Sequence, residues 1–246
     1  MIIKQPIKAV LGMIVMGASA SVEQEFHKSV PDAVQIVTTR VPIGEVSYEG
    51  LREMTDRLPD AARILMDARP DMIAITNMTG SCIRGNEMIN ILQQTTGVPI
   101  LLPPFELVKA LKLMGARRIA MASTFSRELN LVESMFFENH EIQVVRTVSL
   151  KGCYEKDPYA IGRIDYEGIV ETMTGADYAD VDAVVFDHPV MNLNNGVGAE
   201  LEAILPVPFL SINQVLLYSA LQRVGESTDH LFISKFLDGR NRTCPT

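Results

Sequence analysis

Several residue types that mark particular protein classes are scarce in or missing from this chain. Its 246 residues include no tryptophan and only three cysteines, Cys82, Cys153 and Cys244. Because the cysteines are odd in number, widely spaced and without a CxxC pair, they argue against a disulfide framework and against a zinc site. We therefore expect a protein of the reducing cytoplasm.

Long runs of basic residues and long runs of apolar residues are missing as well. The net charge is −8 and no basic run exceeds two residues, so no nucleic-acid partner is predicted. No apolar stretch approaches the length of a membrane span, and the charges and proline near the N-terminus do not fit a signal peptide. GxGxxG, P-loop and HExxH motifs are also missing, so neither a cofactor nor a catalytic metal is predicted.

Two segments of the chain read alike. Segments 71–77 and 182–188 each begin with aspartate, continue through an apolar run and then switch abruptly to polar residues. Their last residues, Asn77 and His188, are 111 positions apart. The Ala-Leu pairs at 110–111 and 220–221, each followed by a glycine four residues later, are 110 positions apart. The repeat predicts two copies of one α/β unit. Facing copies would bring Asn77 and His188 to opposite walls of one cleft.

Strand-like and helix-like patterns alternate along the chain, which predicts parallel sheets with helical crossovers. The strand-like runs are 9–15, 35–38, 72–76, 100–102, 119–122, 143–148, 183–186 and 209–212. The helical patterns are 22–29, 50–67, 84–95, 104–114, 128–138, 166–174, 196–204 and 213–223. We expect an α/β protein whose first lobe is formed by residues 1–105 plus 216–246 and whose second lobe is formed by residues 106–215.

In open parallel sheets, ligands bind beyond the carboxyl ends of the strands. This rule selects four loops, at residues 16–21, 77–82, 123–126 and 187–192. In the second loop, Gly80 lets the backbone approach a ligand, and Thr79, Ser81 and nearby amides would face an anion such as a carboxylate. A plain helix start, with Thr79 or Ser81 as its N-cap and no ligand, explains the same residues equally well.

The last of these loops places an imidazole at a strand end. At an ordinary pKa of about 6.5, His188 would take or give a proton at neutral pH, although a lone histidine is more often structural. We expect Pro189 and Val190 to contact the same ligand. Asp187 is not expected to orient the imidazole, because successive strand side chains point to opposite faces.

The other two loops offer hydroxyl groups and one aromatic ring. Ser19 and Thr124 would contact a ligand or cap a helix, and Phe125 would line a pocket or fill the core. Cys82 is expected to be a buried, inert thiol rather than a thiolate at a helix N-terminus.

Together, several short motifs resemble the aspartate/glutamate racemase superfamily, in particular its maleate cis-trans isomerase and arylmalonate decarboxylase branch. They run over nearly the whole chain: 12–15 with 22–26, 79–81, 115–120, 128–130, 161–163 and 211–214. The resemblance implies two flavodoxin-like lobes in pseudo-twofold relation, with a cofactor-free site between them. It also implies a homo-oligomer, since such proteins often form dimers.

The chain departs from this family at the positions that carry its chemistry. Asn77 and His188 stand where the resemblance places the two cysteines, Phe125 replaces a tyrosine and Ser19 replaces an asparagine. An amide can neither add to a double bond as a thiolate nor shuttle a proton, so racemisation by two cysteines and thiol-addition isomerisation are not predicted.

These departures do not affect the residues that we expect to bind a carboxylate, which we call the carboxylate cradle. Thr79, Gly80, Ser81 and Thr124 would bind a small carboxylate substrate, Asn77 would donate to a carbonyl or enolate oxygen, and His188 would be the single acid or base. The resemblance favours an isomerase or lyase. Two alternatives stay open: a hydrolase in which His188 activates water, and a catalytically inactive homologue that binds a small acid.

Overall fold

The eight strand-like runs form two parallel sheets of four strands each in the part of the chain that the structure describes. This computed structural model describes residues 6–150, 156–188 and 196–238. Two predicted ligand contacts, Pro189 and Val190, lie outside the described residues, as do Cys153 and Cys244. The first sheet contains β1 (Ala9–Met16), β2 (Val34–Val41), β3 (Met72–Ile75) and β4 (Ile100–Leu101). The second contains β5 (Arg118–Ser123), β6 (Gln143–Ser149), β7 (Ala183–Phe186) and β8 (Phe209–Ser211).

The two sheets have the same topology, as the sequence repeat predicts. Their strand orders are β2-β1-β3-β4 and β6-β5-β7-β8, the flavodoxin-like arrangement. Equivalent aspartates form equivalent hydrogen bonds at the starts of β1 and β5. Asp71 accepts a 2.7 Å hydrogen bond from the amide of Val10. Asp182 accepts 2.8 Å hydrogen bonds from the amides of Arg117 and Arg118. The predicted fold class, two α/β lobes with parallel sheets, is confirmed.

Eleven helices connect these strands within the described residues. They are α1 (Val22–Ser29), α2 (Tyr48–Asp56), α3 (Leu58–Met66), α4 (Met78–Thr96), α5 (Pro103–Met114), α6 (Arg127–Glu138), α7 (Pro158–Ile161), α8 (Tyr166–Thr174), α9 (Val197–Ile204), α10 (Ile212–Arg223) and α11 (Ser234–Leu237). Among these helices, none is long and apolar enough to cross a membrane. The short helices α7 and α11 were not predicted.

Two helix predictions were wrong at their boundaries. The predicted helix 50–67 is two helices divided at Arg57, because Pro59 lies in the first turn of α3, where its missing amide hydrogen is tolerated. The predicted helix 84–95 begins earlier, at Met78, because the side chain of Asn77 caps it.

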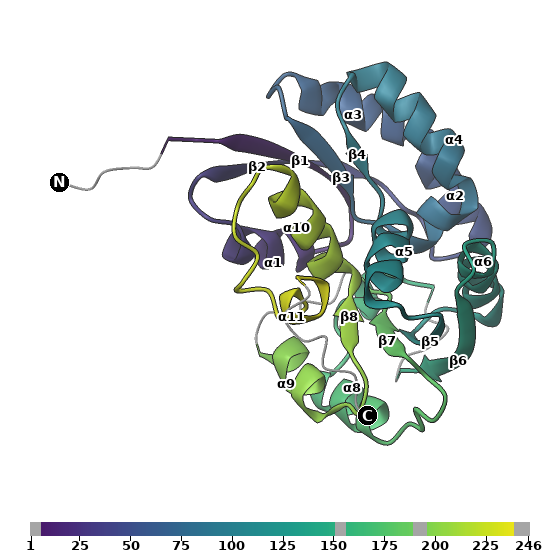
Figure 1. Ribbon diagram of the computed structural model, residues 1–246. Coiled ribbons are helices and arrows are strands. Elements are labelled where there is room, and N and C mark those ends of the chain that lie inside the picture. Colours follow the sequence, from purple (N-terminus) through teal and green to yellow (C-terminus); the bar gives the residue numbers. More distant parts are fainter. Residues whose placement is uncertain (1–5, 151–155, 189–195, 239–246) are drawn as a thin grey trace.

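The helices α5 and α10 join the two lobes. Figure 1 shows α10 following β8 and running back alongside the first sheet, where it packs on α1 and α5 and contacts β3 and β4. The first sheet is thus covered by α1 and α10 on one side and by α3 and α4 on the other. The predicted lobe boundaries at residues 105 and 216 stay a prediction.

The apolar core follows from strands that are buried on both faces. Alternate residues of β1 point to opposite sides, so that Met13 joins one buried cluster and Ile14 the other. Met121 and Ala122 divide in the same way in β5. Each cluster therefore contains residues from both sheets, which fixes the strand ends of the two sheets relative to one another.

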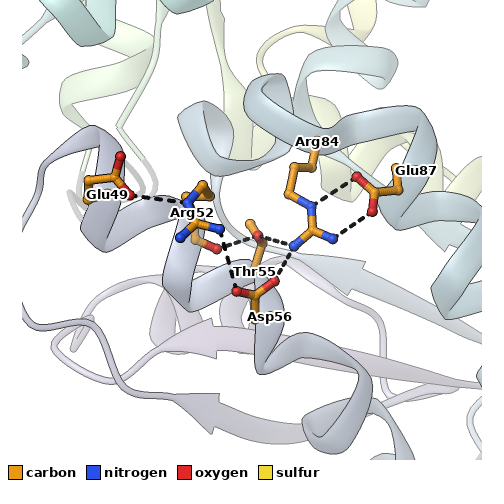
Figure 2. A network of polar contacts seen from close by, with 6 residues as sticks. All are labelled: Glu49, Arg52, Thr55, Asp56, Arg84 and Glu87. Carbon is orange, nitrogen blue, oxygen red and sulfur yellow. Dashed lines mark hydrogen bonds and ion pairs between the residues drawn. The ribbon is translucent and has the colours of Figure 1, made fainter.

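A polar network holds α2 against α4 on the outside of the first lobe (Figure 2). Arg84 leaves helical backbone conformation, at φ −132° and ψ 21°, and its guanidinium reaches Thr55 at 3.3 Å and an oxygen of Asp56. The same guanidinium forms a fork with Glu87, at 2.7 and 3.0 Å. The network fixes the helix that carries Leu51 above the first turn of α4.

Candidate functional site

A small cavity lies at the carboxyl ends of strands from both sheets. Its volume is about 20 Å³, enough for one water molecule. Residues at the strand ends or just after them line it from both lobes, namely Met16, Asn77, Met78, Phe125 and His188. The other lining residues in the described part of the chain are apolar: Val46, Leu51, Pro158 and Ile161. The two residues singled out by the repeat, Asn77 and His188, therefore border one cavity.

Asn77 is the N-cap of α4. Its Oδ1 accepts a 2.6 Å hydrogen bond from the amide of Gly80, and its Nδ2 lies 2.9 Å from the sulfur of Met16. A thioether sulfur is a weak acceptor, so this amide hydrogen is poorly satisfied. Gly80 is required here, since a Cβ at this position would collide with Asn77 Oδ1. The capping role predicted for Thr79 or Ser81 belongs to Asn77 instead.

The hydroxyl groups of Thr79 and Ser81 face away from the cavity. Thr79 donates to Oε1 of Glu133, and Ser81 donates to the backbone oxygen of Asn77. Both residues are buried, and neither they nor Gly80 line the cavity. What reaches the cavity from this loop is the start of α4 itself, at Met78, where the helix dipole favours an anion.

The tautomer of His188 follows from its hydrogen bonds. The backbone N–H of Thr124, which can only donate, lies 3.3 Å from Nε2, and the Thr124 hydroxyl also contacts Nε2. Nε2 is therefore the acceptor and Nδ1 carries the hydrogen of the neutral ring. Nδ1 is buried and has no hydrogen-bond partner among the described residues. Thr124, a predicted ligand contact, is thus bonded to His188 and does not itself line the cavity.

Burial lowers the pKa of His188 to about 3. The ring is 1% exposed and packs against Phe125, with 4.6 Å between ring centroids, and against Phe186. The expected pKa of about 6.5 is therefore wrong for this closed site, because desolvation disfavours the imidazolium. His188 is a neutral hydrogen-bond donor at physiological pH.

Asp187 and Glu133 supply two further buried carboxyl groups in this region. Oδ1 of Asp187 is 3.7 Å from Nε2 of His188, which is beyond hydrogen-bond distance. Asp187 was not expected to orient the imidazole, and the ring nitrogen Nε2 is instead bonded by Thr124. Glu133 on α6 is the second carboxyl group and was not predicted. Its sequence signal is an acid on the apolar helix face formed by Leu129 and Phe136.

The pKa values of both carboxyl groups are raised. Burial raises the pKa of Asp187 to about 7, partly opposed by the nearby Ser123 hydroxyl and Glu133. Burial and the charge of Asp187 raise the pKa of Glu133 well above its ordinary value, partly opposed by the hydrogen bond from Thr79. Burial, with these two carboxyl groups, also raises the pKa of Cys82, which suits the inert thiol predicted from sequence.

Ser19, a predicted ligand contact in the first loop, lies beside the cavity lining without being part of it. It is 2% exposed, and its hydroxyl has no hydrogen-bond partner within the described ranges. Its backbone oxygen accepts a 2.7 Å hydrogen bond from Arg40, which also bonds Gly17 and so fixes the loop after β1.

These features define a class: a two-lobed parallel α/β protein with a small site between equivalent strand ends and buried titratable groups around it. The sequence profile described as arylmalonate decarboxylase matches residues 11–230. The chain therefore belongs to the arylmalonate decarboxylase family. This confirms the resemblance drawn from sequence motifs, while the replacement of two family cysteines by Asn77 and His188 stays a prediction.

Two characterised relatives are similar to most of the chain. Maleate isomerase of Geobacillus stearothermophilus is 22% identical over 235 residues, covering 89% of this chain and 92% of the relative. Arylmalonate decarboxylase of Bordetella bronchiseptica is 22% identical over 223 residues, covering 87% and 90%. The family thus comprises isomerase- and lyase-type enzymes, and the prediction of an enzyme of this type is confirmed.

Solved structures share the fold. Maleate cis-trans isomerase of Nocardia farcinica, bound to TRIS, superposes with a TM-score of 0.82 at 19% identity, covering 92% of this chain and 98% of that one. Maleate isomerase of Pseudomonas putida S16 with maleate gives 0.80 at 18% identity, covering 93% and 99%. A cysteine variant of the Nocardia enzyme carries a covalently bound succinylcysteine intermediate and gives 0.80 at 20% identity, covering 89% and 93%.

Proposed function

We propose that this protein is a cofactor-independent isomerase or lyase that moves a proton at a carbon next to the carboxylate or carbonyl group of a small acid. In this proposal His188 is the acid that replaces the family cysteine. The observation that carries it concerns His188, a residue of the cavity lining, whose Nδ1–H is buried and has no partner in the described chain. Perturbed titratable groups clustered at strand ends support catalysis over binding alone.

The hydrogen-bond pattern favours His188 as a donor over His188 as a base. A base needs a free lone pair, and the only lone pair of the neutral ring, on Nε2, accepts from Thr124. The Nδ1–H can instead donate to an enolate oxygen or deliver its proton to a carbanion carbon. This disfavours the hydrolase alternative, in which the ring would have to take a proton from water.

The opposite wall offers groups for an anion. Asn77 Nδ2 can exchange its weak contact with the Met16 sulfur for a carboxylate oxygen at little cost. The N-terminus of α4, which reaches the cavity at Met78, adds the positive end of a helix dipole. Of the predicted cradle, Thr79, Gly80 and Ser81 would contribute through this helix start, since both hydroxyls are already bonded.

Substrate entry requires the cavity walls to part. A volume of about 20 Å³ admits one water but no dicarboxylate. Val46 and Leu51 form the wall of the first lobe, Pro158 and Ile161 form that of the second, and the amide of Val46 bonds the Lys156 oxygen at 2.7 Å. These apolar walls would exclude water from the reacting carbon after closure. They also favour a substrate with an apolar substituent.

The relatives support the reaction class and the kind of substrate. Their names state action on maleate and on arylmalonate, which are both small dicarboxylates. A cysteine variant of the Nocardia enzyme carries a covalently bound succinylcysteine intermediate. No cysteine among the described residues lines the cavity of this chain, so proton transfer without a thiol adduct is the step that we propose.

Proton NMR in D2O with small dicarboxylates and arylmalonates tests this proposal. We expect isomerisation, decarboxylation or deuterium incorporation by the wild-type protein, and its loss in His188→Ala. His27→Ala, an exposed change in the last turn of α1, is the matched control and should keep the activity. Retained turnover in His188→Ala would refute the acid assignment. Saturable binding without chemistry would favour the inactive homologue, and release of hydrolysis products would favour the hydrolase.

A further inference from the structure

Asp187 and Glu133 form a buried acid pair for which the proposed function has so far no use. Both are 0% exposed. Neither oxygen of Asp187, nor Oε2 of Glu133, has a hydrogen bond of ordinary geometry to the described part of the chain. The groups around them are Thr79 and Cys82 on α4, Ser123 at the end of β5, and His188. No basic side chain is among the described groups that act on the pKa of either acid.

Elementary electrostatics dictates the charge of this pair. Two ionised carboxylates cannot stay side by side in a dry interior without a cation, so the pair retains protons at neutral pH. Both pKa values are raised, by burial first and in Glu133 also by Asp187. The pair therefore holds an exchangeable proton 3.7 Å from Nε2 of His188, the ring nitrogen that accepts hydrogen bonds.

We infer that this acid pair is the proton reservoir of His188, with Asp187 acting through the imidazole and Glu133 holding Asp187 in its protonated form. The inference rests on the proposed function. As Nδ1–H breaks and the proton forms a C–H bond at the substrate carbanion, the O–H bond of Asp187 breaks and its proton forms a new Nε2–H bond. The ring changes tautomer without gaining net charge, and Asp187 is left as a carboxylate.

The relay removes an obstacle that His188 alone would meet. A neutral ring that gives up its only N–H proton would become a strongly basic imidazolate, and charging the ring first is opposed by its low pKa of about 3. Simultaneous delivery to Nε2 avoids both states. Nε2 must give up its contacts with both the hydroxyl and the backbone N–H of Thr124, and Oδ1 of Asp187, which is 3.7 Å away, must approach it. In a decarboxylation, loss of CO2 supplies the carbanion, and solvent restores the proton of the pair when the site opens.

Infrared spectroscopy of the unliganded protein tests the reservoir without any substrate. We expect a carboxylic-acid C=O band that shifts in D2O, fades as pH rises through about 7 and is lost in Asp187→Asn. Glu133→Gln should move the same titration, and it serves as a second variant if the first fails to fold. The matched control is Glu25→Gln, another buried acid with a pKa of about 7, which bonds Asn213 and Gln214 away from the cavity. The control should leave this band in place. A spectrum of Asp187→Asn that superimposes on that of the wild type would overturn the inference.

Kinetics separate failure of the relay from failure of the proposed function. On a substrate found by the NMR assay, Asp187→Asn should lower kcat at least tenfold with little change in KM, and should remove the fall of kcat above pH 7. Unchanged kcat in Asp187→Asn, with turnover lost in His188→Ala, would overturn the relay and leave the proposed function standing. If His188→Ala itself retains turnover, the relay falls together with the proposed function, whatever the infrared band shows.

Discussion

Replacing Asp187 with asparagine should stabilise the protein at alkaline pH. The side chain is fully buried, and its pKa rises from 3.8 to about 7, mainly through burial. Asparagine has nearly the shape of the protonated acid and cannot ionise. The variant therefore retains the packing of the low-pH state and loses the penalty of burying a charge.

The sign and size follow from linkage. A carboxyl group with a raised pKa in the folded state contributes stability that is fully present below its unfolded pKa, near 4, and lost as pH rises through its folded pKa of about 7. A shift of about 3 units corresponds to about 4 kcal/mol between these limits. We expect Asp187→Asn to match the wild type to within about 1 kcal/mol at pH 4 and to exceed it by roughly 2–4 kcal/mol at pH 8.

Urea unfolding at several pH values between 4 and 8 is the assay. Asp60→Asn is the control, because this carboxylate is 83% exposed and should leave the pH dependence of unfolding unchanged. The reasoning is refuted if Asp187→Asn and wild type show the same dependence on pH, or if the variant loses stability toward pH 8 relative to the wild type.

Three further predictions concern the buried thiol, the cavity wall and the polar network between α2 and α4. Cys82→Ser should keep turnover of any substrate within about twofold, because the thiol neither lines the cavity nor ionises readily; loss of turnover would contradict its inert role. Ile161→Ala should cost about 2–4 kcal/mol in urea unfolding and lower KM for bulkier acids by enlarging the cavity, and an unchanged KM series would contradict this wall assignment. Arg84→Ala should cost about 1 kcal/mol in low salt and less in 1 M NaCl; equal cost in both would contradict an electrostatic role.

The fold was largely predictable because buried parallel strands leave a strong pattern. Each central strand is an apolar run that ends in polar residues, and its repetition at about 110 residues reveals the second lobe. Helix ends were less predictable, since they depend on single side chains. Pro59 divides one predicted helix, and the cap formed by Asn77 starts another before the apolar pattern begins.

The site was predictable in position and less so in detail. Strand ends selected the loops of Asn77 and His188, and both border the cavity. The partners of those side chains depend on long-range packing that local spacing does not contain. Thr124 binds the imidazole rather than the cavity, and Glu133 reaches the site from a helix that connects other strands. The apolar walls come from the loop at Val46, from Leu51 in α2 and from the short helix α7, which is too short to leave a periodic signal.

The protonation of His188 is the measurement that tests the account most directly. Long-range ¹H–¹⁵N correlation of the ¹⁵N-labelled histidines identifies the protonated nitrogen, with His188→Ala giving the assignment. The account predicts a neutral ring protonated at Nδ1 from pH 5 to pH 8, because Thr124 bonds Nε2 and burial lowers the pKa to about 3. A ring protonated at Nε2, or one that becomes charged as pH falls to about 6, would contradict it.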